Sequence, residues 1–168
     1  EDPAVDPARI GVTGQSGGGA LSFHLAVVDE RIRAVSSWCG VSTPLDAVRN
    51  RHVAQNCDCF YPINLHRRDL AEYAALIAPR AAMFCCADHD PLFHPSEVRA
   101  FVERTRSVFR WYGREEDCLL VACPGPHGSH PEFEAATAEL FDRCLAGRPM
   151  PALARGTGEG EERALSIF

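Results

Sequence analysis

No stretch of this 168-residue sequence approaches the roughly 20 consecutive apolar residues that a transmembrane helix needs. No charged-then-apolar leader opens the chain at Glu1, although a leader or a whole segment missing upstream would leave the same pattern. A long basic run is also absent, and 17 Lys and Arg stand against 23 Asp and Glu, for a formal charge of -6. The composition therefore argues against a membrane protein and against nucleic acid as the main partner, and favours a small neutral ligand.

Paired cysteines with the spacing of a structural zinc site are missing as well. The sequence has eight cysteines, several of them inside apolar, strand-like runs, which is typical of buried free thiols rather than a disulfide scaffold. An alternative is that Cys57-Asp58-Cys59, with His52 and Cys85-Cys86, binds zinc, although structural sites usually separate paired cysteines by two or more residues. Free thiols favour the cytoplasm, but the sequence leaves the compartment and the oligomeric state open.

Apolar runs alternate with amphipathic segments, and no internal repeat is visible. We expect strands at 9–13, 34–39, 80–86 and 118–123, and helices over 18–28, after Thr43, from Asp69 to before Pro79, over 96–112 and from Ser129 to Gly147. Asp69 with Glu72, and Ser129 with Glu132, have the spacing of a capping box. Residues 49–68 are polar and are expected to form an irregular excursion.

Continuous apolar strands separated by helices indicate an α/β protein with a parallel sheet that is covered on both faces. An apolar fraction of 46% is enough for a sizeable core in a single domain, which we place at 1–147. Residues 148–168 are rich in Pro, Gly and Glu and are expected to form a flexible, solvated tail or the start of a truncated C-terminal segment.

Gly14-Gln15-Ser16-Gly17-Gly18 fits the pattern G-x-S-x-G, between an expected strand and an expected helix. A serine in such a strand-to-helix turn has a strained backbone, so its neighbours must be small. The turn aims the amide of Gly17 and the start of a helix at the place where an acyl oxygen would become negative. The simpler alternative is a glycine-rich turn with a capping serine, but the context favours a nucleophile.

A nucleophilic serine needs a base and an orienting acid, and in parallel sheets these residues meet beyond the carboxyl ends of strands. His127 follows the expected strand 118–123, and Asp88 and Asp90 follow the strand 80–86. We favour Asp90, because it sits further beyond the strand where a loop can turn toward the histidine. His130 is the competitor for His127, but it is expected within the first turn of the next helix.

Other residues near the expected site are less informative. His24 lies in the helix after the serine turn and is more typical of a packed or surface residue. Trp38 and Cys39 end a strand close to the site, so they could line a pocket, although core packing explains them equally well. Gln15, beside the serine, is a further candidate for substrate binding.

The segments DPARIGVTGQSGGGA, NCDCFYPIN, AALIAPRAAMFCCADHDPLF and PGPH, read together, resemble the C-terminal half of α/β-hydrolases of the acetylxylan esterase and cephalosporin-C deacetylase type. The resemblance covers residues 3–147 and is weaker for dienelactone hydrolases, which use a cysteine nucleophile. It implies a serine carboxylesterase acting on acetyl or other small esters of a carbohydrate, without metal or cofactor. The nucleophile would be Ser16, the acid Asp90 and the base His127.

The chain departs from this family at several positions. Ala87 stands where relatives have glycine at the strand exit, His94 is an extra residue before Pro95, and Gly17 and Gly19 stand where glucuronoyl esterases usually have bulkier, charged residues. The first strands and the loop that donates the second oxyanion amide would precede Glu1, so we expect a fragment that is weak or inactive alone. Alternatives are a non-catalytic module of the same fold, a peptidase or lactone hydrolase, and a thiol- or metal-dependent protein.

Overall fold

Residues 5–55 and 67–146 are described by the computed structural model. They form one parallel sheet in the order β1 (Ile10–Gln15), β2 (Ile32–Trp38), β3 (Ala81–His89) and β4 (Cys118–Pro126). The α-helices are α1 (Gly17–Val28), α2 (Pro44–Arg49), α3 (Leu70–Ala74), α4 (Pro95–Trp111) and α5 (Pro131–Leu145), and 3-10 turns lie at Val53–Gln55, Ala75–Ile77 and Glu115–Asp117. The α/β class expected from the sequence is confirmed.

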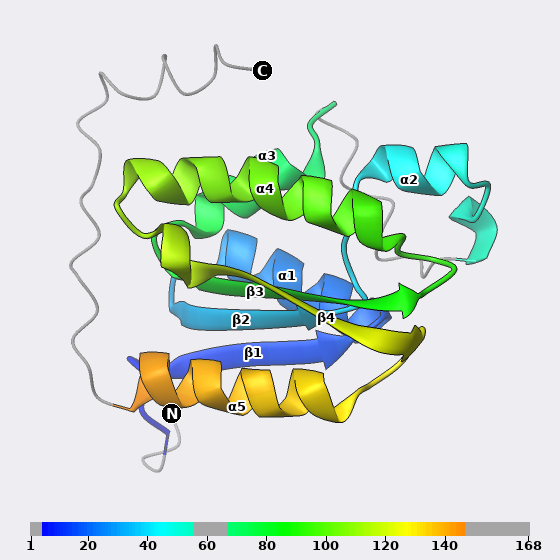
Figure 1. The fold of residues 1–168 in the computed structure, drawn as a ribbon. Coiled ribbons are helices and arrows are strands. Elements are labelled where there is room, and N and C mark those ends of the chain that lie inside the picture. The colour runs from blue at the N-terminus through cyan, green and yellow to red at the C-terminus, as the bar shows by residue number, and fades with distance from the viewer. Residues whose placement is uncertain (1–4, 56–66, 147–168) are drawn as a thin grey trace.

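Helices cover both faces of the sheet. α1, α3 and α4 lie against one face and α5 lies against the other (Figure 1). Because each crossover returns the chain to the same end of the sheet, the carboxyl ends of all four strands lie along one edge. In the described part of the chain, no helix is both long and apolar enough to cross a membrane.

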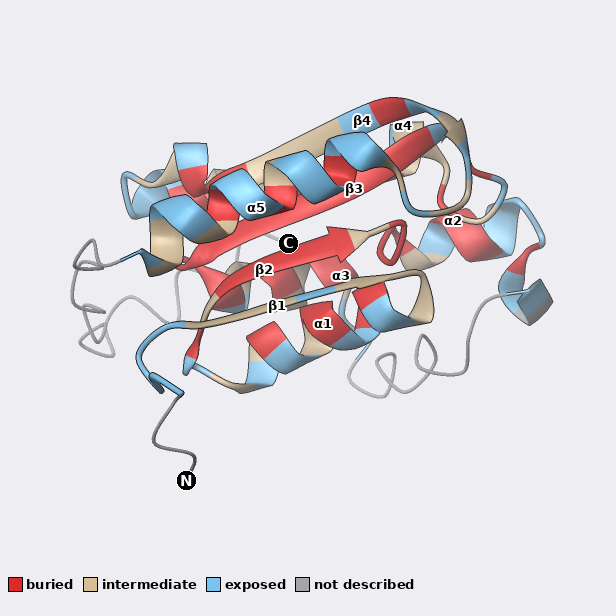
Figure 2. Cartoon of the chain, turned by 90° about the horizontal axis from the view of Figure 1, so that it is seen from below, coloured by how far each residue is buried: buried red, intermediate tan, exposed pale blue. Residues whose placement is uncertain are grey.

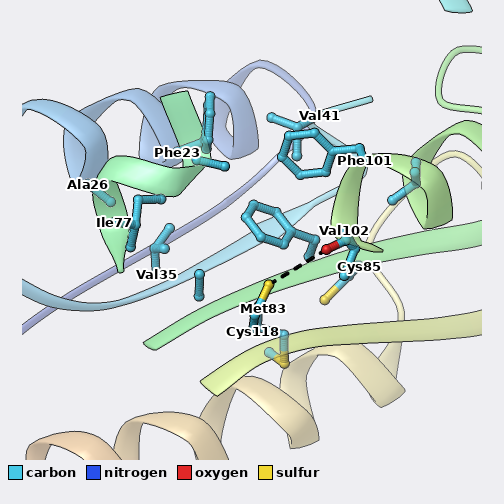
Figure 3. Close-up of a cluster of buried hydrophobic side chains, with 14 of the residues drawn as sticks. Phe23, Ala26, Val35, Val41, Ile77, Met83, Cys85, Phe101, Val102 and Cys118 are labelled. Atoms are coloured by element: carbon cyan, nitrogen blue, oxygen red, sulfur yellow. Dashed lines mark hydrogen bonds between the residues drawn. The ribbon is translucent and has the colours of Figure 1, made fainter. Parts of the chain in front are cut away.

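The core lies on both sides of the sheet, and its aromatic cluster lies between the sheet and the helices α1, α3 and α4. Phe23 of α1, Phe84 of β3 and Phe101 of α4 are fully buried, and Phe84 and Phe101 meet edge to face with ring centroids 4.9 Å apart. Figure 3 shows Phe23 and Phe101 among the aliphatic side chains of this cluster. Such an aromatic pair contributes about 0.5 to 1.5 kcal/mol beyond the area that it buries.

The four strands differ in burial. β2 and most of β3 are buried, whereas β1 is only half-buried and exposes Thr13 (Figure 2). Among the described residues, β1 pairs with β2 alone, so it has the exposure of an edge strand.

Several expected boundaries are wrong. β3 continues to His89 and β4 to Pro126, where the two strands still pair, so Asp88 belongs to a strand and not to the loop after it. The capping box from Ser129 does not form: the N-cap of α5 is His130 without a side-chain hydrogen bond, and Pro131 sets the first turn of the helix.

The capping box of α3 is confirmed, because Asp69 accepts from the backbone N–H of Ala71 while the carboxylate of Glu72 accepts from that of Asp69. The six described cysteines carry free thiols, and five of them are buried. Cys57 and Cys59, the partners of the zinc alternative, lie outside the described residues, as do the expected helix end at Gly147 and the tail.

Candidate active site

Ser16 stands alone between β1 and α1, at the edge where the strands end. Its φ of 55° and ψ of -120° are an unusual conformation for a residue with a side chain, of the kind that clusters at functional sites. The turn is held from two sides, because the N–H of Ser16 donates to the carbonyl of Trp38 and the N–H of Ala20 donates to the carbonyl of Ser16, both at 2.9 Å. The backbone therefore fixes the serine where the sequence pattern predicted it.

The glycines around Ser16 have different reasons to be glycine. A Cβ at Gly14 would lie 2.4 Å from the carbonyl oxygen of Gly18, and one at Gly19 would lie 2.8 Å from that of Trp38. A Cβ at Gly18 would meet nothing within 4 Å. Close packing of backbone against backbone thus requires glycine at 14 and 19, while position 18 has room for a methyl group.

His127 connects Ser16 to Asp90. Its Nε2 lies 2.9 Å from the hydroxyl oxygen of Ser16, and its Nδ1 lies 2.8 Å from Oδ2 of Asp90. An ionised carboxylate only accepts hydrogen bonds, so Nδ1 donates to Asp90, which leaves the lone pair of Nε2 facing the serine hydroxyl. Three side chains from the ends of β1, β3 and β4 thus form one continuous chain of hydrogen bonds. Asp88 is exposed on β3 and takes no part in it.

Asp90 is almost completely buried and every oxygen of its carboxylate is engaged. Oδ2 accepts from His127, and Oδ1 accepts from the backbone N–H groups of Leu92 at 2.8 Å and Phe93 at 3.1 Å. Burial alone would raise the pKa of Asp90, but these hydrogen bonds and the charge of His127 outweigh it and hold the pKa below its ordinary value. Asp90 is therefore ionised at neutral pH.

Two further side chains contact the imidazole of His127. The ring of Phe93 is stacked on it, with centroids 5.8 Å apart and planes 18° apart. The amide nitrogen of Gln15 lies 3.2 Å from Nε2, so this amide shares the acceptor nitrogen with Ser16. The sequence interpretation assigned Gln15 to substrate binding and did not single out Phe93, whose only signal was its place three residues after Asp90.

Trp38 is the last residue of β2 and Cys39 follows it, with its Sγ within 4.8 Å of ligand atoms of Asp90 and His127. The indole N–H of Trp38 donates to Ser36 and Thr137, and its ring packs on Phe133, so the side chain belongs to the packing of β2 against α5. Burial raises the pKa of the Cys39 thiol to about 12, so Cys39 stays neutral.

Gly17 is the first residue of α1, directly after the serine. Backbone N–H groups in the first turn of a helix point away from the helix and carry the positive end of its dipole. The assignment of the Gly17 amide to an oxyanion hole stays a prediction.

The sequence interpretation agrees with the structure for His24 but not for His130. His130 was expected inside a helix and on the surface, but it precedes α5, is half-buried, and its Nε2 donates to the carbonyl of Pro126 at 2.9 Å. It thereby closes the loop that carries His127. His24 packs beside Phe23, with ring centroids 5.0 Å apart, and burial lowers its pKa.

Comparison with known proteins finds no matching family model. Among curated proteins, "Putative hydrolase YtaP" of Bacillus subtilis (strain 168) is 26% identical over 118 residues, which is 70% of this chain and 39% of that protein.

Solved structures with a similar fold include Methylesterase BT1017, at a TM-score of 0.68 and 24% identity over 84% of this chain and 31% of that chain. Another is the glucuronoyl esterase from Sporotrichum thermophile in complex with methyl 4-O-methyl-beta-D-glucopyranuronate, at a TM-score of 0.65 and 19% identity over 88% of this chain and 46% of that chain. The chain thus spans less than half the length of the relatives it matches. These similarities, with the parallel sheet and the serine turn, show that the chain has the α/β-hydrolase fold.

Proposed function

We propose that this chain carries the catalytic residues of a serine carboxylic ester hydrolase, with Ser16 as nucleophile, His127 as base and Asp90 as the orienting acid. The observation that carries the proposal is the unbroken chain of hydrogen bonds from the buried carboxylate of Asp90 through His127 to a serine in a strained turn. A histidine that serves packing alone would not need to contact a serine, and a serine that only caps a helix would not need to contact a histidine.

Acylation follows from this arrangement. As the hydroxyl oxygen of Ser16 attacks the ester carbonyl carbon, Nε2 of His127 takes the hydroxyl proton. Asp90 holds Nδ1–H and stabilises the positive charge of the imidazolium. The carbonyl oxygen becomes negative and faces the Gly17 amide at the start of α1. Collapse of the tetrahedral intermediate breaks the bond to the alcohol oxygen, which takes the proton from His127 and leaves.

Deacylation repeats these steps with water. His127 removes a proton from water as the water oxygen attacks the acyl carbon, and the second tetrahedral intermediate expels Ser16, which regains a proton from His127. The products are an alcohol and a carboxylic acid, and the enzyme returns to its starting state.

For the substrate, we propose an ester of a carbohydrate. The family resemblance favours an acetyl group on a sugar hydroxyl, while the glucuronoyl esterase bound to a methyl glucuronate raises a sugar carboxylate as the acyl part. Both are neutral esters, which fits a chain with a formal charge of -6 better than an anionic substrate would.

The test is hydrolysis of three esters by the full-length protein that contains this chain: p-nitrophenyl acetate, an acetylated xylose and the methyl ester of 4-O-methylglucuronic acid. We expect Ser16→Ala to lower kcat/KM for the preferred ester by about 10³-fold or more, because the triad acts as a unit. Ser107→Ala is the control and should leave the rate unchanged, because it removes a half-buried hydroxyl on α4 that donates to the carbonyl of Arg104 within the same helix. A Ser16→Ala variant that keeps most of the activity would show that another residue attacks.

A further inference from the structure

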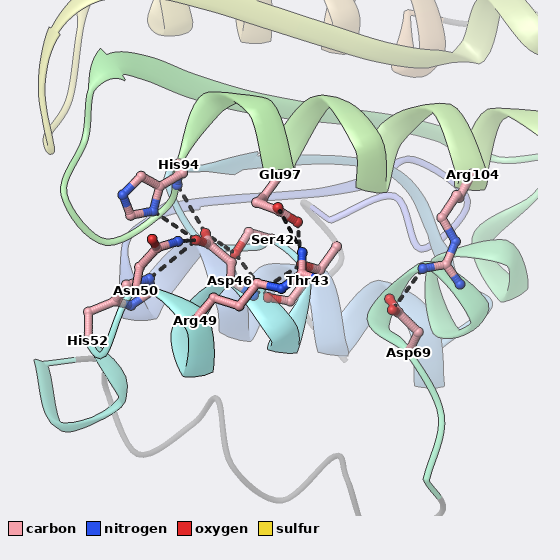
Figure 4. A network of polar contacts seen from close by, with 10 residues as sticks. All are labelled: Ser42, Thr43, Asp46, Arg49, Asn50, His52, Asp69, His94, Glu97 and Arg104. Atoms are coloured by element: carbon pink, nitrogen blue, oxygen red, sulfur yellow. Dashed lines mark hydrogen bonds and ion pairs between the residues drawn. The ribbon is translucent and has the colours of Figure 1, made fainter.

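The loop from Asp90 to His94, which joins β3 to α4, is fastened at its far end by a buried carboxylate on α2. The backbone N–H of His94 donates to Oδ2 of Asp46 at 3.1 Å, and its Nδ1 lies 2.7 Å from Oδ1 of the same residue (Figure 4). Two donors of one residue thus bind one carboxylate, which fixes both the backbone and the ring of His94.

Asp46 is fully buried and has further partners. The hydroxyl of Ser42 donates to Oδ2 at 2.9 Å, the amide of Asn50 donates to Oδ1 at 2.7 Å, and Nε2 of His52 lies 3.5 Å from Oδ1. Burial alone would raise the pKa of Asp46, but the hydrogen bonds from Asn50, His94 and Ser42 and the charge of His94 outweigh it and lower the pKa. Asp46 is therefore ionised, and both oxygens of its carboxylate accept hydrogen bonds.

Beside Asp46, a second contact joins Thr43, the N-cap of α2, to the first turn of α4. The hydroxyl of Thr43 donates to the carboxylate of Glu97 on α4 at 2.7 Å, and Arg49 lies 3.9 Å from that carboxylate. α2 and the start of α4 are therefore held together by two carboxylates, of which Asp46 contacts the loop itself.

The residues between the two ends of the loop contact the triad. The N–H groups of Leu92 and Phe93 donate to Asp90, and the ring of Phe93 stacks on His127. A shift of His94 would displace its neighbour Phe93, and with it the acceptor geometry of Asp90 and the packing of His127.

We propose that Asp46 is a positioning residue, which holds the loop Asp90–His94 so that Asp90 and Phe93 orient His127. The catalytic consequence rests on the proposed function, whereas the effect on His127 does not. Asp46 contributes no group to the reacting atoms.

The same side chains form a set that also suits a metal ion, because ligand atoms of Asp46, His52 and His94 lie within 4.8 Å of one another. Both oxygens of Asp46 already accept hydrogen bonds from Ser42, Asn50 and His94, which favours an anchor made of hydrogen bonds. The test must therefore include a chelator.

The readout is the proton NMR resonance of Nδ1–H of His127 in the purified chain, which reports its hydrogen bond to Asp90 whether or not the protein hydrolyses anything. We expect Asp46→Asn and His94→Ala to shift this resonance upfield or broaden it. His94→Asn, whose amide can donate in place of Nδ1, should restore it in part. In ester hydrolysis, kcat should fall by about 10- to 100-fold with little change in KM, as expected for a small misplacement of catalytic groups.

Asp117→Asn is the matched control. Asp117 is also a buried carboxylate, paired with Arg114 and Arg143, but it precedes β4 at the opposite end of the sheet. It should lower Tm as Asp46→Asn does, while leaving the resonance and kcat unchanged. The proposal is overturned if the resonance of Asp46→Asn matches that of the wild type, if Asp117→Asn moves it equally, or if EDTA alone reproduces the effect of Asp46→Asn. Failure of the proposed function would instead appear as full activity in Ser16→Ala, with the resonance still sensitive to Asp46.

Discussion

Asp88 and Asp90 are two positions apart and have opposite environments. Asp88 is still part of β3 and its side chain is exposed, whereas Asp90 follows the strand and is buried among three donors. Placement beyond the strand end thus distinguishes the two carboxylates, as the sequence interpretation assumed, although the strand ends three residues later than it expected.

This difference predicts the effect of removing each charge. Asp90→Asn should lower kcat by several orders of magnitude, because the amide no longer holds the required tautomer of His127; the same change in a well-studied serine protease costs about 10⁴-fold. Asp88→Asn should change kcat by less than about twofold, as for most surface substitutions. Steady-state kinetics of the two variants would decide, and a larger effect at Asp88 would mean that the acid is misassigned.

The same hydrogen bonds predict acid sensitivity of the fold. The pKa of Asp90 is lowered in the folded state, so the unfolded chain binds more protons at low pH. The stability contributed by Asp90 is therefore complete above the unfolded pKa of about 3.9 and is lost as pH falls through the lower folded value. Urea unfolding from pH 6 to pH 3 should show a smaller loss of unfolding free energy in Asp90→Asn than in the wild type. Equal losses would contradict the ionised, hydrogen-bonded Asp90.

The sequence predicted Ser16 from its G-x-S-x-G turn, and Asp90 and His127 from their places beyond the carboxyl ends of apolar strands. It did not single out Phe93, whose ring stacks on His127, or Asp46, whose carboxylate on α2 binds His94 just before α4. Arg80 shows the same limit: its buried guanidinium donates to carbonyls of four other residues, and nothing near it in the sequence reveals this. Roles that depend on contacts between distant segments leave no local pattern.

At the scale of elements, the turn between β1 and α1 makes a prediction about its own glycines. Gly14→Ala should destabilise the protein and abolish activity, because its Cβ would overlap the backbone of Gly18. Gly18→Ala should be tolerated and could raise stability by up to about 1 kcal/mol, since alanine is the better helix former and the site is open. Thermal unfolding and ester hydrolysis measure both effects. Similar losses in the two variants would contradict the packing described for this turn.

The elements themselves were largely predictable, because buried strands and amphipathic helices have distinct periodicities. The errors fall at the carboxyl edge of the sheet, where β3 and β4 pair through His89 and Pro126. Polar residues and prolines are typical of loops. At the carboxyl ends of β3 and β4 they nevertheless continue the strands, because each strand forms backbone hydrogen bonds with the other. The start of α5 at His130 is a similar case, since a proline and not a capping serine defines it.

At the scale of the whole molecule, the parallel order of four strands joins parts of the chain that lie far apart in sequence. Ser16 and His127 are 111 positions apart and lie within hydrogen-bonding distance because β1 and β4 end at the same edge. The arrangement explains why residues from three strand ends make one site. The chain spans 31 to 46% of the solved esterase chains described above. The activity of the whole protein is therefore a proposal, which rests on the site at the carboxyl ends of these strands.

The most direct test of the central claim is covalent labelling of the full-length protein that contains this chain with a fluorophosphonate probe, followed by mass spectrometry of the labelled peptide. An activated serine attacks the phosphorus and displaces fluoride, whereas an ordinary serine hydroxyl does not react. We expect one label per chain, on Ser16, lost in Ser16→Ala and strongly slowed in His127→Ala, while Ser107→Ala labels like the wild type. An unlabelled full-length wild-type protein, or a label on another residue, would contradict the assignment of Ser16, His127 and Asp90 as a working triad.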